Sequence, residues 1–404
     1  MSAAPPILKG LRVLDIAHQY SGANAAALLA DLGADVLSVE NPKGSPIRTM
    51  LPKKGTESLW WKVVQRGKKA ITLKLSSQRG REIFLDLARQ HDVLIENFRP
   101  GTLERWNIGP EDLERAGCNL VLLRISGFGQ TGPMRDQPGF GVMGEAMSGF
   151  AHLNGYPDGP PTFPSTTLGD GVASVFGVFG AMAAMVEKLK TGKQGVQVID
   201  VALFEALFRI IPTQVTSYDQ LGKVPSRPGN FLGQHGVMRN VYRTSDNKYF
   251  CVGGVGYAAI RRVLVGACAD ALVARIDTGI MDRDMPTIVA FLNECNAHIE
   301  AWAATRTYAE VARSMADSGA VNGPVFDAAD IANSAHYQAR GDLIRVPDHD
   351  FGPVLMQGVV PKFPGREHTV AHSGRARGAD NAAVYGALGL TNEEMERLKA
   401  EGVI

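Results

Sequence analysis

The first half of the chain alternates short, almost wholly apolar runs with stretches in which apolar residues recur every three or four positions. The apolar runs predict strands that are buried on both faces, and the spaced stretches predict helices. The predicted strands are Leu11–Ile16, Asp35–Val39, Val93–Phe98 and Leu120–Ile125, and the predicted helices are Asn24–Leu32, Gly80–Gln90, Gly171–Lys190 and Val201–Ile211. This alternation predicts an α/β fold with an open parallel sheet that carries helices on both faces.

The pattern changes in the second half. Leu221–Gly236 is rich in Gly, Pro and Arg and is typical of a linker. Two β-rich runs, Val241–Thr244 and Tyr249–Val252, flank a polar turn and predict a hairpin, and helical spacing follows over residues 258–317. A chain of 404 residues is long for a single core. We therefore expect a large domain over residues 1–220, a smaller α+β domain over 225–325, and a return segment over 326–404 that completes the large domain.

Charge and cysteine content narrow the class of protein. Forty-two Lys and Arg oppose 41 Asp and Glu, a balance that argues against partners such as nucleic acid or an anionic membrane. None of the four cysteines forms a CxxC pair, so we expect neither disulfides nor a zinc site, and a cytoplasmic location. Met1–Lys9 lacks the apolar core of a signal peptide. The apolar run Gly171–Val186 is short for a membrane span and predicts a buried helix.

The turn after the first predicted strand decides against a dinucleotide site. Residues 17–23 hold one glycine, where the dinucleotide fingerprint needs three. The following helix could still bind an anion at its N-terminus. Positive charge is available near these turns, and for most of these side chains the simplest interpretation is a solvated surface residue: Lys43, Arg48, Lys53, Lys54, Arg66, Lys68, Lys69, Arg99 and Arg105. Arg99 directly follows a predicted strand and is the first candidate for an anion contact.

Asp170 lies between Gly169 and Gly171 at the start of a helix made of small residues. Spacing alone favours a structural helix N-cap. The flanking glycines, however, remove side chains on both sides and would let a large ligand approach the carboxylate. Both interpretations remain open from the residues themselves.

Several motifs together resemble class III CoA-transferases, the family that includes formyl-CoA and carnitine CoA-transferases and succinyl-CoA:dicarboxylate relatives. The motifs are Leu8–Asp15, Leu32–Val36, Glu96–Gly101, Gly127–Pro133 and Leu168–Asp170. The resemblance covers nearly the whole chain. It implies a Rossmann-like large domain, a smaller α+β domain and an intertwined homodimer.

The resemblance also implies a chemistry. Coenzyme A is carried as an acyl-CoA substrate, no metal takes part, and Asp170 attacks the thioester so that an aspartyl-CoA thioester forms. The implied CoA contacts are His18, Gln19, Tyr20, Ser21, Asn97, Phe98, Arg99 and Arg105. Gly253, Gly254 and Gly256 resemble a glycine-rich loop that covers the reacting thioester, although Val255 interrupts the run. The lysine that some relatives carry near residue 140 is absent between Gly127 and Glu187.

Two alternatives were weighed against the transferase. An α-methylacyl-CoA racemase of the same superfamily would carry a His-Asp pair where Phe140 and Gly141 stand, and phenylalanine cannot accept a proton. A CoA-binding protein without catalysis is the other. The acids that donate and accept CoA are not readable from the residues, although the resemblance favours dicarboxylates. The adjacent Trp60 and Trp61 are predicted to pack in a core or an interface.

Overall fold

The computed structural model describes residues 4–404 and divides them into two compact units. Unit 1 takes in residues up to 150, 163–216 and 336–404, and unit 2 takes in 151–162 and 217–335. Compared with the boundaries expected from the sequence, residues 151–162, 217–220 and 326–335 belong with the smaller unit. In both units the chain leaves and returns, so neither unit is one continuous segment.

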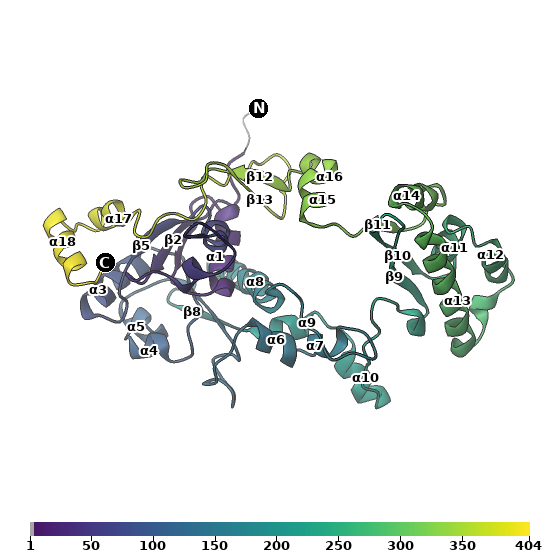
Figure 1. Cartoon of the computed structure of the whole chain (residues 1–404). Helices are drawn as coiled ribbons and strands as arrows, with labels where there is room; N and C mark the ends of the chain where they lie inside the picture. The colour runs from purple at the N-terminus through teal and green to yellow at the C-terminus, as the bar shows by residue number, and fades with distance from the viewer. Residues whose placement is uncertain (1–3) are drawn as a thin grey trace. The chain divides into compact units, whose positions relative to one another are not determined.

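A six-stranded parallel sheet forms the centre of unit 1 (Figure 1). The strands, in the order in which they lie across the sheet, are β5 (Lys69–Thr72), β2 (Asp35–Glu40), β1 (Arg12–Asp15), β6 (Val93–Glu96), β7 (Val121–Ser126) and β8 (Gln197–Ala202). Val13 of β1 pairs with Val36 on one side and Val93 on the other. The chain builds outwards from β1 in one direction and from β6 in the other. The junction of β1 and β6 is therefore the topological switch point, where open α/β sheets bind ligands beyond the carboxyl ends of their strands.

Both faces of the sheet are covered because successive side chains of a strand point to opposite sides. Val13 packs on one side with Ala25 of α1 (Tyr20–Asp31) and Ala173 of α8 (Leu168–Thr191). Leu14 packs on the other side with Phe84. The helices on that second side are α3 (Gln78–Ala88), α4 (Thr102–Arg105), α5 (Pro110–Arg115), α17 (Asn381–Ala387) and α18 (Asn392–Ala400). Each fully buried Val or Leu contributes about 1.5–3 kcal/mol, which is why the central strands are apolar on both faces.

Two strands of the sheet were not predicted, β5 and β8. β8 ends at Ala202, where the sequence had already started a helix at Val201, and the helix α9 begins at Leu203. β8 is an edge strand, and Val198 and Asp200 on it are exposed. A short edge strand that runs directly into a helix gives no continuous apolar run, so the pattern of the helix extends over its end.

The long helix α8 is buried along one side only. Its buried stripe consists of Gly169, Ala173, Ser174, Gly177, Ala181 and Ala184. On its other side Val175, Phe179 and Leu189 are 57%, 71% and 80% exposed. The prediction of a buried helix is therefore right for one side and wrong for the other. By length and composition alone, α8 would also suffice to cross a membrane.

The remaining elements of unit 1 lie beside the sheet. They include η1 (Pro46–Thr49), β3 (Lys53–Lys54), β4 (Glu57–Ser58), α2 (Leu59–Val64), α6 (Gly141–Met147), α9 (Leu203–Arg209), β12 (Leu343–Val346) and β13 (Val354–Gln357). Three short helices fall at or next to the boundaries of the units, α7 (Phe150–Leu153), α10 (Gln214–Leu221) and α16 (Ala335–Ala339).

Unit 2 is an α+β structure with its own core. A three-stranded antiparallel sheet has the order β11-β10-β9, with β9 at Val237–Arg243, β10 at Tyr249–Val255 and β11 at Asn322–Pro324. Its helices are α11 (Tyr257–Gly266), α12 (Asp270–Asp277), α13 (Met285–Ala304), α14 (Tyr308–Asp317) and α15 (Ala328–Asn333), with 3-10 turns η2 (Gly233–His235) and η3 (Ile280–Asp282). The pairing of Val241 with Cys251 confirms the predicted hairpin, and both strands are longer than expected. Phe250 and Phe291 are fully buried between sheet and helices.

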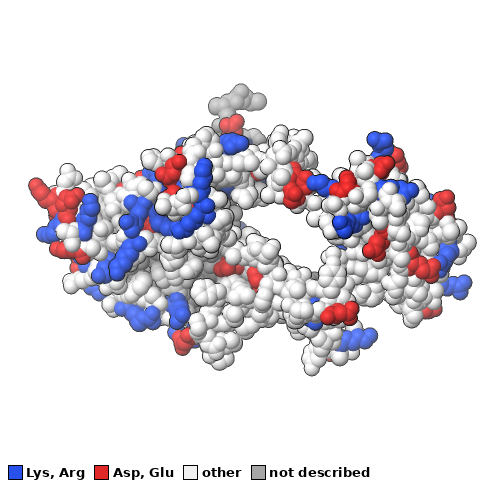
Figure 2. All heavy atoms as spheres, viewed as in Figure 1, with Lys and Arg blue, Asp and Glu red and all other residues white. Residues whose placement is uncertain are grey.

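The distribution of charge agrees with the near-neutral balance of the sequence. Figure 2 shows Lys and Arg interspersed with Asp and Glu on the visible face of both units. A field of mixed sign does not concentrate anions over the whole surface, so an anionic ligand must be held by a few local groups.

Candidate functional site

Two of the segments predicted to bind CoA meet at the switch point of the sheet. Asn97, directly after β6, accepts a hydrogen bond through Oδ1 from the backbone N–H of His18, at 3.0 Å. Its Nδ2 donates to the backbone oxygen of Gln19 at 3.1 Å and to Oγ of Ser21 at 3.3 Å. One amide therefore ties the loop after β6 to the turn between β1 and α1. Residues 18–21 and 97–98 lie together, as the sequence predicts.

A flat aromatic surface lies beside this junction. The rings of His18 and Phe98 stack with centroids 4.6 Å apart and an interplanar angle of 12°. Both side chains line a small hollow of about 100 Å³, which β2 borders at Glu40. Burial lowers the pKa of His18, so its ring is neutral near pH 7. Its buried Nδ1 has no hydrogen-bond partner among the described residues, and so it is available to a polar group of a ligand.

The basic residues of the region divide into two kinds. Arg99 and Arg105 are exposed at the end of β6 and in α4, and Arg105 donates to Oγ1 of Thr102 at 2.8 Å. Arg66 and Lys68 are buried instead, Arg66 in an ion pair with Asp31 and Lys68 in one with Asp15. The prediction of solvated surface residues is therefore wrong for Arg66 and Lys68. Lys68 Nζ also donates to the backbone oxygen of Ala23 at 2.7 Å, which fixes the first turn of α1.

The buried carboxylate of Glu96, the last residue of β6, holds the loop that follows this strand. Glu96 accepts the backbone N–H of Phe98 at 2.6 Å and pairs with Arg124 at 2.7 Å. Arg124 in turn pairs with Glu104 on α4 at 2.7 Å. Burial raises the pKa of Glu96 to about 7 against the opposing effect of Arg124. This network is not predictable from the sequence, because its members are separated in the chain and only the strand pairing brings them together.

Asp170 lies in the first turn of α8 and is not its N-cap. The cap position belongs to Thr167, and the helix begins at Leu168. Ser21 hydrogen-bonds to the Asp170 carboxylate, and the same hydroxyl accepts the bond from Asn97. Ser174 Oγ lies 2.7 Å from the backbone oxygen of Ser21 and 2.8 Å from that of Asp170. The proposed nucleophile is therefore linked through Ser21 to the segments at the switch point.

The electrostatic surroundings of Asp170 oppose its ionisation. Burial, with a further contribution from the negative charge of Glu145, raises the pKa of Asp170 to about 6, while the bond from Ser21 acts in the opposite direction. Within residues 4–404 no Lys, Arg or His forms an ion pair with this carboxylate. At pH 7 a group of this pKa is about nine-tenths ionised. Asp170 is thus a carboxylate that carries charge without a counterion.

Gly141 makes room for this carboxylate. A Cβ atom on Gly141 would lie 2.0 Å from Oδ2 of Asp170, far inside contact distance. Gly141 is the first residue of α6, and Phe140, the preceding N-cap, is 62% exposed. In the sequence, these two residues bear only on the racemase alternative. The structure adds a steric reason, since any side chain at residue 141 would displace Asp170.

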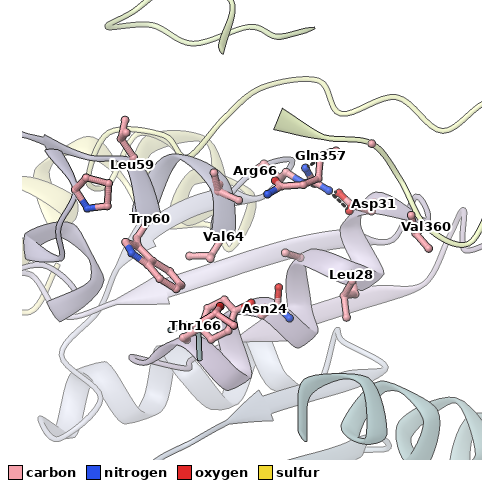
Figure 3. A pocket seen from close by; sticks show the side chains of 15 residues that line it. Asn24, Leu28, Asp31, Leu59, Trp60, Val64, Arg66, Thr166, Gln357 and Val360 are labelled. Carbon is pink, nitrogen blue, oxygen red and sulfur yellow. Dashed lines mark hydrogen bonds and ion pairs between the residues drawn. The ribbon is translucent and has the colours of Figure 1, made fainter. Parts of the chain in front are cut away.

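A cavity of about 500 Å³ lies beside Tyr20 and Thr166. Figure 3 shows Asn24, Leu28, Trp60 and Thr166 among the side chains around it, with the ion pair of Arg66 and Asp31 at one wall. Tyr20 also lines it and packs edge-on against Trp60, with ring centroids 4.9 Å apart.

Tyr20 lies between this cavity and the start of α8, which carries Asp170. It hydrogen-bonds with Thr167, the cap of α8. Its burial, followed by the charge of Asp170, raises the pKa of Tyr20. Both tryptophans pack as the sequence predicts. Trp61 is 1% exposed and belongs to a core, and Trp60 packs against that core and also lines the cavity.

The predicted glycine loop lies in unit 2. Gly253 and Gly254 belong to the end of β10, and Gly256 caps α11 with a φ of +76°, which favours glycine. Val255 between them is 77% exposed. The role of this glycine loop at a thioester stays a prediction.

The sequence profile of CoA-transferase family III matches residues 8–381. The chain belongs to this family. It is thus a family III CoA-transferase, an enzyme that acts on acyl-CoA, and its α/β fold with a parallel sheet is the one expected.

Relatives of this CoA-transferase agree over almost the full length. It is 34% identical to a succinyl-CoA–D-citramalate CoA-transferase from Chloroflexus aurantiacus, over 99% of this chain and 98% of the relative. It is 30% identical to a formyl-CoA:oxalate CoA-transferase from Streptomyces avermitilis, over 98% and 99% of the two chains. A crystal structure of a CAIB/BAIF family protein from Brucella suis superposes with a TM-score of 0.83 at 26% identity, covering 95% and 100% of the two chains.

We expect Asn97→Ala to weaken CoA binding by this transferase. The substitution removes three hydrogen bonds that hold residues 18–21 against the loop after β6. A loss of about 1.4 kcal/mol raises Kd about tenfold. Isothermal titration with CoA measures the effect, and Asn119→Ala, on the exposed surface, is the matched control. A Kd equal to that of the unaltered enzyme would show that Asn97 does not organise the CoA site.

Proposed function

We propose that this enzyme transfers CoA between carboxylic acids through a thioester formed on Asp170. The observation that carries the proposal is the setting of its carboxylate, which lies in the first turn of α8, faces the bare backbone of Gly141 and lacks a cationic partner among residues 4–404. A carboxylate of this kind is free to attack. An aspartate that served only as a helix N-cap would occupy the cap position, which here is Thr167.

The proposed reaction runs in two balanced halves. An oxygen of Asp170 attacks the thioester carbon of the donor, the C–S bond breaks, and the negative charge passes to the CoA thiolate. The thiolate then attacks Cγ of Asp170, the bond from Cγ to the anhydride oxygen breaks, and the donor leaves as a carboxylate. The acceptor carboxylate repeats both steps in reverse order and leaves as its CoA thioester. No proton or electron is gained or lost, since each step exchanges one anion for another.

The residues around Asp170 suggest how CoA is held. We assign the adenine to the stacked rings of His18 and Phe98, and the phosphates to the exposed Arg99 and Arg105. Gln19, Tyr20 and Ser21 line the path towards Asp170. The acyl group is assigned to the cavity bordered by Tyr20 and Trp60. Gly253, Gly254 and Gly256 are proposed to cover the thioester.

The substrates are proposed from the relatives. Succinyl-CoA is the donor in the names of the D-citramalate and L-malate transferases that match 98–99% of this chain. We therefore propose succinyl-CoA as donor and a dicarboxylate as acceptor. The test is to incubate the enzyme with succinyl-CoA and a panel of mono- and dicarboxylates and to identify the new thioesters by mass. If none of the acids in the panel gave a new CoA thioester, the proposal would be contradicted.

The same incubation, run in deuterium oxide with a 2-methylacyl-CoA, distinguishes the two alternatives. A racemase would exchange deuterium into the α-carbon, and a protein that only binds CoA would give neither deuterium nor a new thioester. The position of Phe140 and Gly141 supports the transferase over the racemase.

We also propose a homodimer. Val175, Phe179 and Leu189 expose an apolar side of α8, and Val198 does so on the neighbouring edge strand β8. Few charged side chains lie over α6 and α9 on the face in Figure 2. Apolar area of this kind is typical of a protein interface. Light scattering during gel filtration tests it, and a monomeric mass at micromolar concentration would contradict it.

The exchange rate should fall in acid. Only the ionised carboxylate can attack, and burial together with Glu145 raises the pKa of Asp170 to about 6. The rate should therefore be full above pH 7 and decline as the pH falls through about 6, with a tenfold loss for each further unit. The measurement is kcat/KM across this range, with circular dichroism at each pH to confirm folding. A midpoint near 4 would contradict a raised pKa.

A further inference from the structure

Glu145 is a buried carboxylate for which the fold alone gives no reason. It lies on α6 with 4% of its surface exposed. Its Oε1 accepts the backbone N–H of Gly169, the residue before Asp170, at 3.1 Å. A Cβ on Gly169 would lie 2.8 Å from the backbone oxygen of Gly141 and 3.4 Å from Cγ of Glu145, so α6 and α8 touch closely here. Glu145 therefore contacts the helical turn that carries the proposed nucleophile, Asp170.

The carboxylates of Glu145 and Asp170 thus lie together at the start of α8. Within residues 4–404, neither Glu145 nor Asp170 forms an ion pair with a basic side chain. A buried charge without a partner destabilises the folded protein, and an apolar or amide side chain would fill the same space without that cost. The negative charge of Glu145 also acts on Asp170. An arrangement that is costly for stability points to a use in the reaction.

We propose that Glu145 is a positioning residue that holds the start of α8 against α6 and, through like-charge repulsion, favours the acylated state of Asp170. This inference rests on the proposed thioester mechanism. When Asp170 forms the anhydride or the CoA thioester, its charge leaves with the thiolate or with the donor carboxylate. The repulsion from Glu145 is present in the free enzyme and relieved in both covalent states. Only an interaction that changes in this way alters the course of the reaction.

The other groups that face Asp170 do not share this effect. Besides Glu145 on α6, the groups that face Asp170 are Tyr20 and Ser21, both on α1. Burial and the charge of Asp170 raise the pKa of Tyr20, so it stays neutral between pH 5 and 8. Ser21 does not titrate. A change in the acid limb on altering residue 145 is therefore attributable to the charge at that residue.

The test replaces Glu145 by glutamine, whose carbonyl oxygen can still accept the N–H of Gly169. Removal of one nearby charge should lower the acid midpoint of kcat/KM by about 1 pH unit. With succinyl-CoA and no acceptor acid, the equilibrium between aspartyl-CoA thioester and free enzyme should fall about tenfold. Glu145→Asp keeps the charge and should keep the acid midpoint of the unaltered enzyme. Glu396→Gln, on an exposed side of α18, is the matched control and should change neither quantity.

The outcomes separate the two proposals. If the unaltered enzyme forms no thioester on Asp170, the proposed function fails. If it does, and Glu145→Gln shows the same midpoint and the same thioester equilibrium, the role of Glu145 is overturned. Failure of Glu145→Gln to fold would also overturn it, because the charge would then be needed for stability and not for reactivity.

Discussion

Asparagine in place of Asp170 is expected to abolish CoA exchange while the enzyme still binds CoA. The amide has nearly the same shape and can still meet Ser21, but it carries no charge and attacks a thioester poorly. Loss of the nucleophile in a covalent mechanism should lower kcat by at least about 10³-fold. The measurement is the initial rate of succinyl-CoA exchange, with the Kd of CoA determined on the same preparation.

The matched control is Asp86→Asn on α3, an exposed aspartate that pairs with Arg89. It removes one carboxylate from the surface and should leave the exchange rate within a factor of two of the unaltered enzyme, since exposed pairs contribute about 0.2–1 kcal/mol at most. Exchange that survives Asp170→Asn at more than a tenth of the normal rate would refute a covalent role for this residue.

Alanine at residue 141 should produce the second largest loss. Its Cβ would lie 2.0 Å from Oδ2 of Asp170 and 2.9 Å from Cγ, so the carboxylate must move or rotate. A shift of about 1 Å in a reacting group costs about 10²-fold in rate. We expect kcat to fall by about that factor, with little change in the Kd of CoA because the switch-point segments are untouched. The steady-state kinetics of succinyl-CoA exchange provide the measurement.

Gly386→Ala is the control for this prediction. Gly386 lies in α17, where an added Cβ meets no atom within 4 Å. Alanine there should raise stability by about 0.5–1 kcal/mol through its helix propensity and leave the rate unchanged. If Gly141→Ala were fully active, the carboxylate would have to react from a position other than the one it occupies against Gly141.

The sequence predicted the parts of the site that lie at the carboxyl ends of the central strands. His18 follows the predicted strand Leu11–Ile16, and Asn97 lies at the end of the predicted strand Val93–Phe98. Parallel strands bring their carboxyl ends to one edge of the sheet, so the meeting of these two residues was foreseeable. The same reasoning predicted the central strands. It failed for the edge strand β8, where only one neighbour pairs with the strand and the apolar run is broken by exposed residues such as Asp200.

Contacts away from the ends of the predicted strands could not be predicted. Glu145 meets Gly169 across 24 positions of sequence, and nothing in the spacing indicates that α6 lies against the start of α8. Spacing alone favours a cap role for Asp170, because the flanking glycines do not show that the helix begins two residues earlier, at Leu168. Burial of Arg66 and Lys68 was likewise invisible, since their partners Asp31 and Asp15 belong to other elements.

The most direct test is chemical trapping of the acylated enzyme. The enzyme is incubated with succinyl-CoA, quenched with hydroxylamine, digested and analysed by peptide mass spectrometry. Hydroxylamine converts an activated carboxyl group into a hydroxamate, so the account predicts a hydroxamate on Asp170 that requires succinyl-CoA and is absent from Asp170→Asn. The account would be contradicted if the enzyme exchanged CoA while the peptide that contains Asp170 stayed unmodified. A hydroxamate on a different carboxylate would also contradict it.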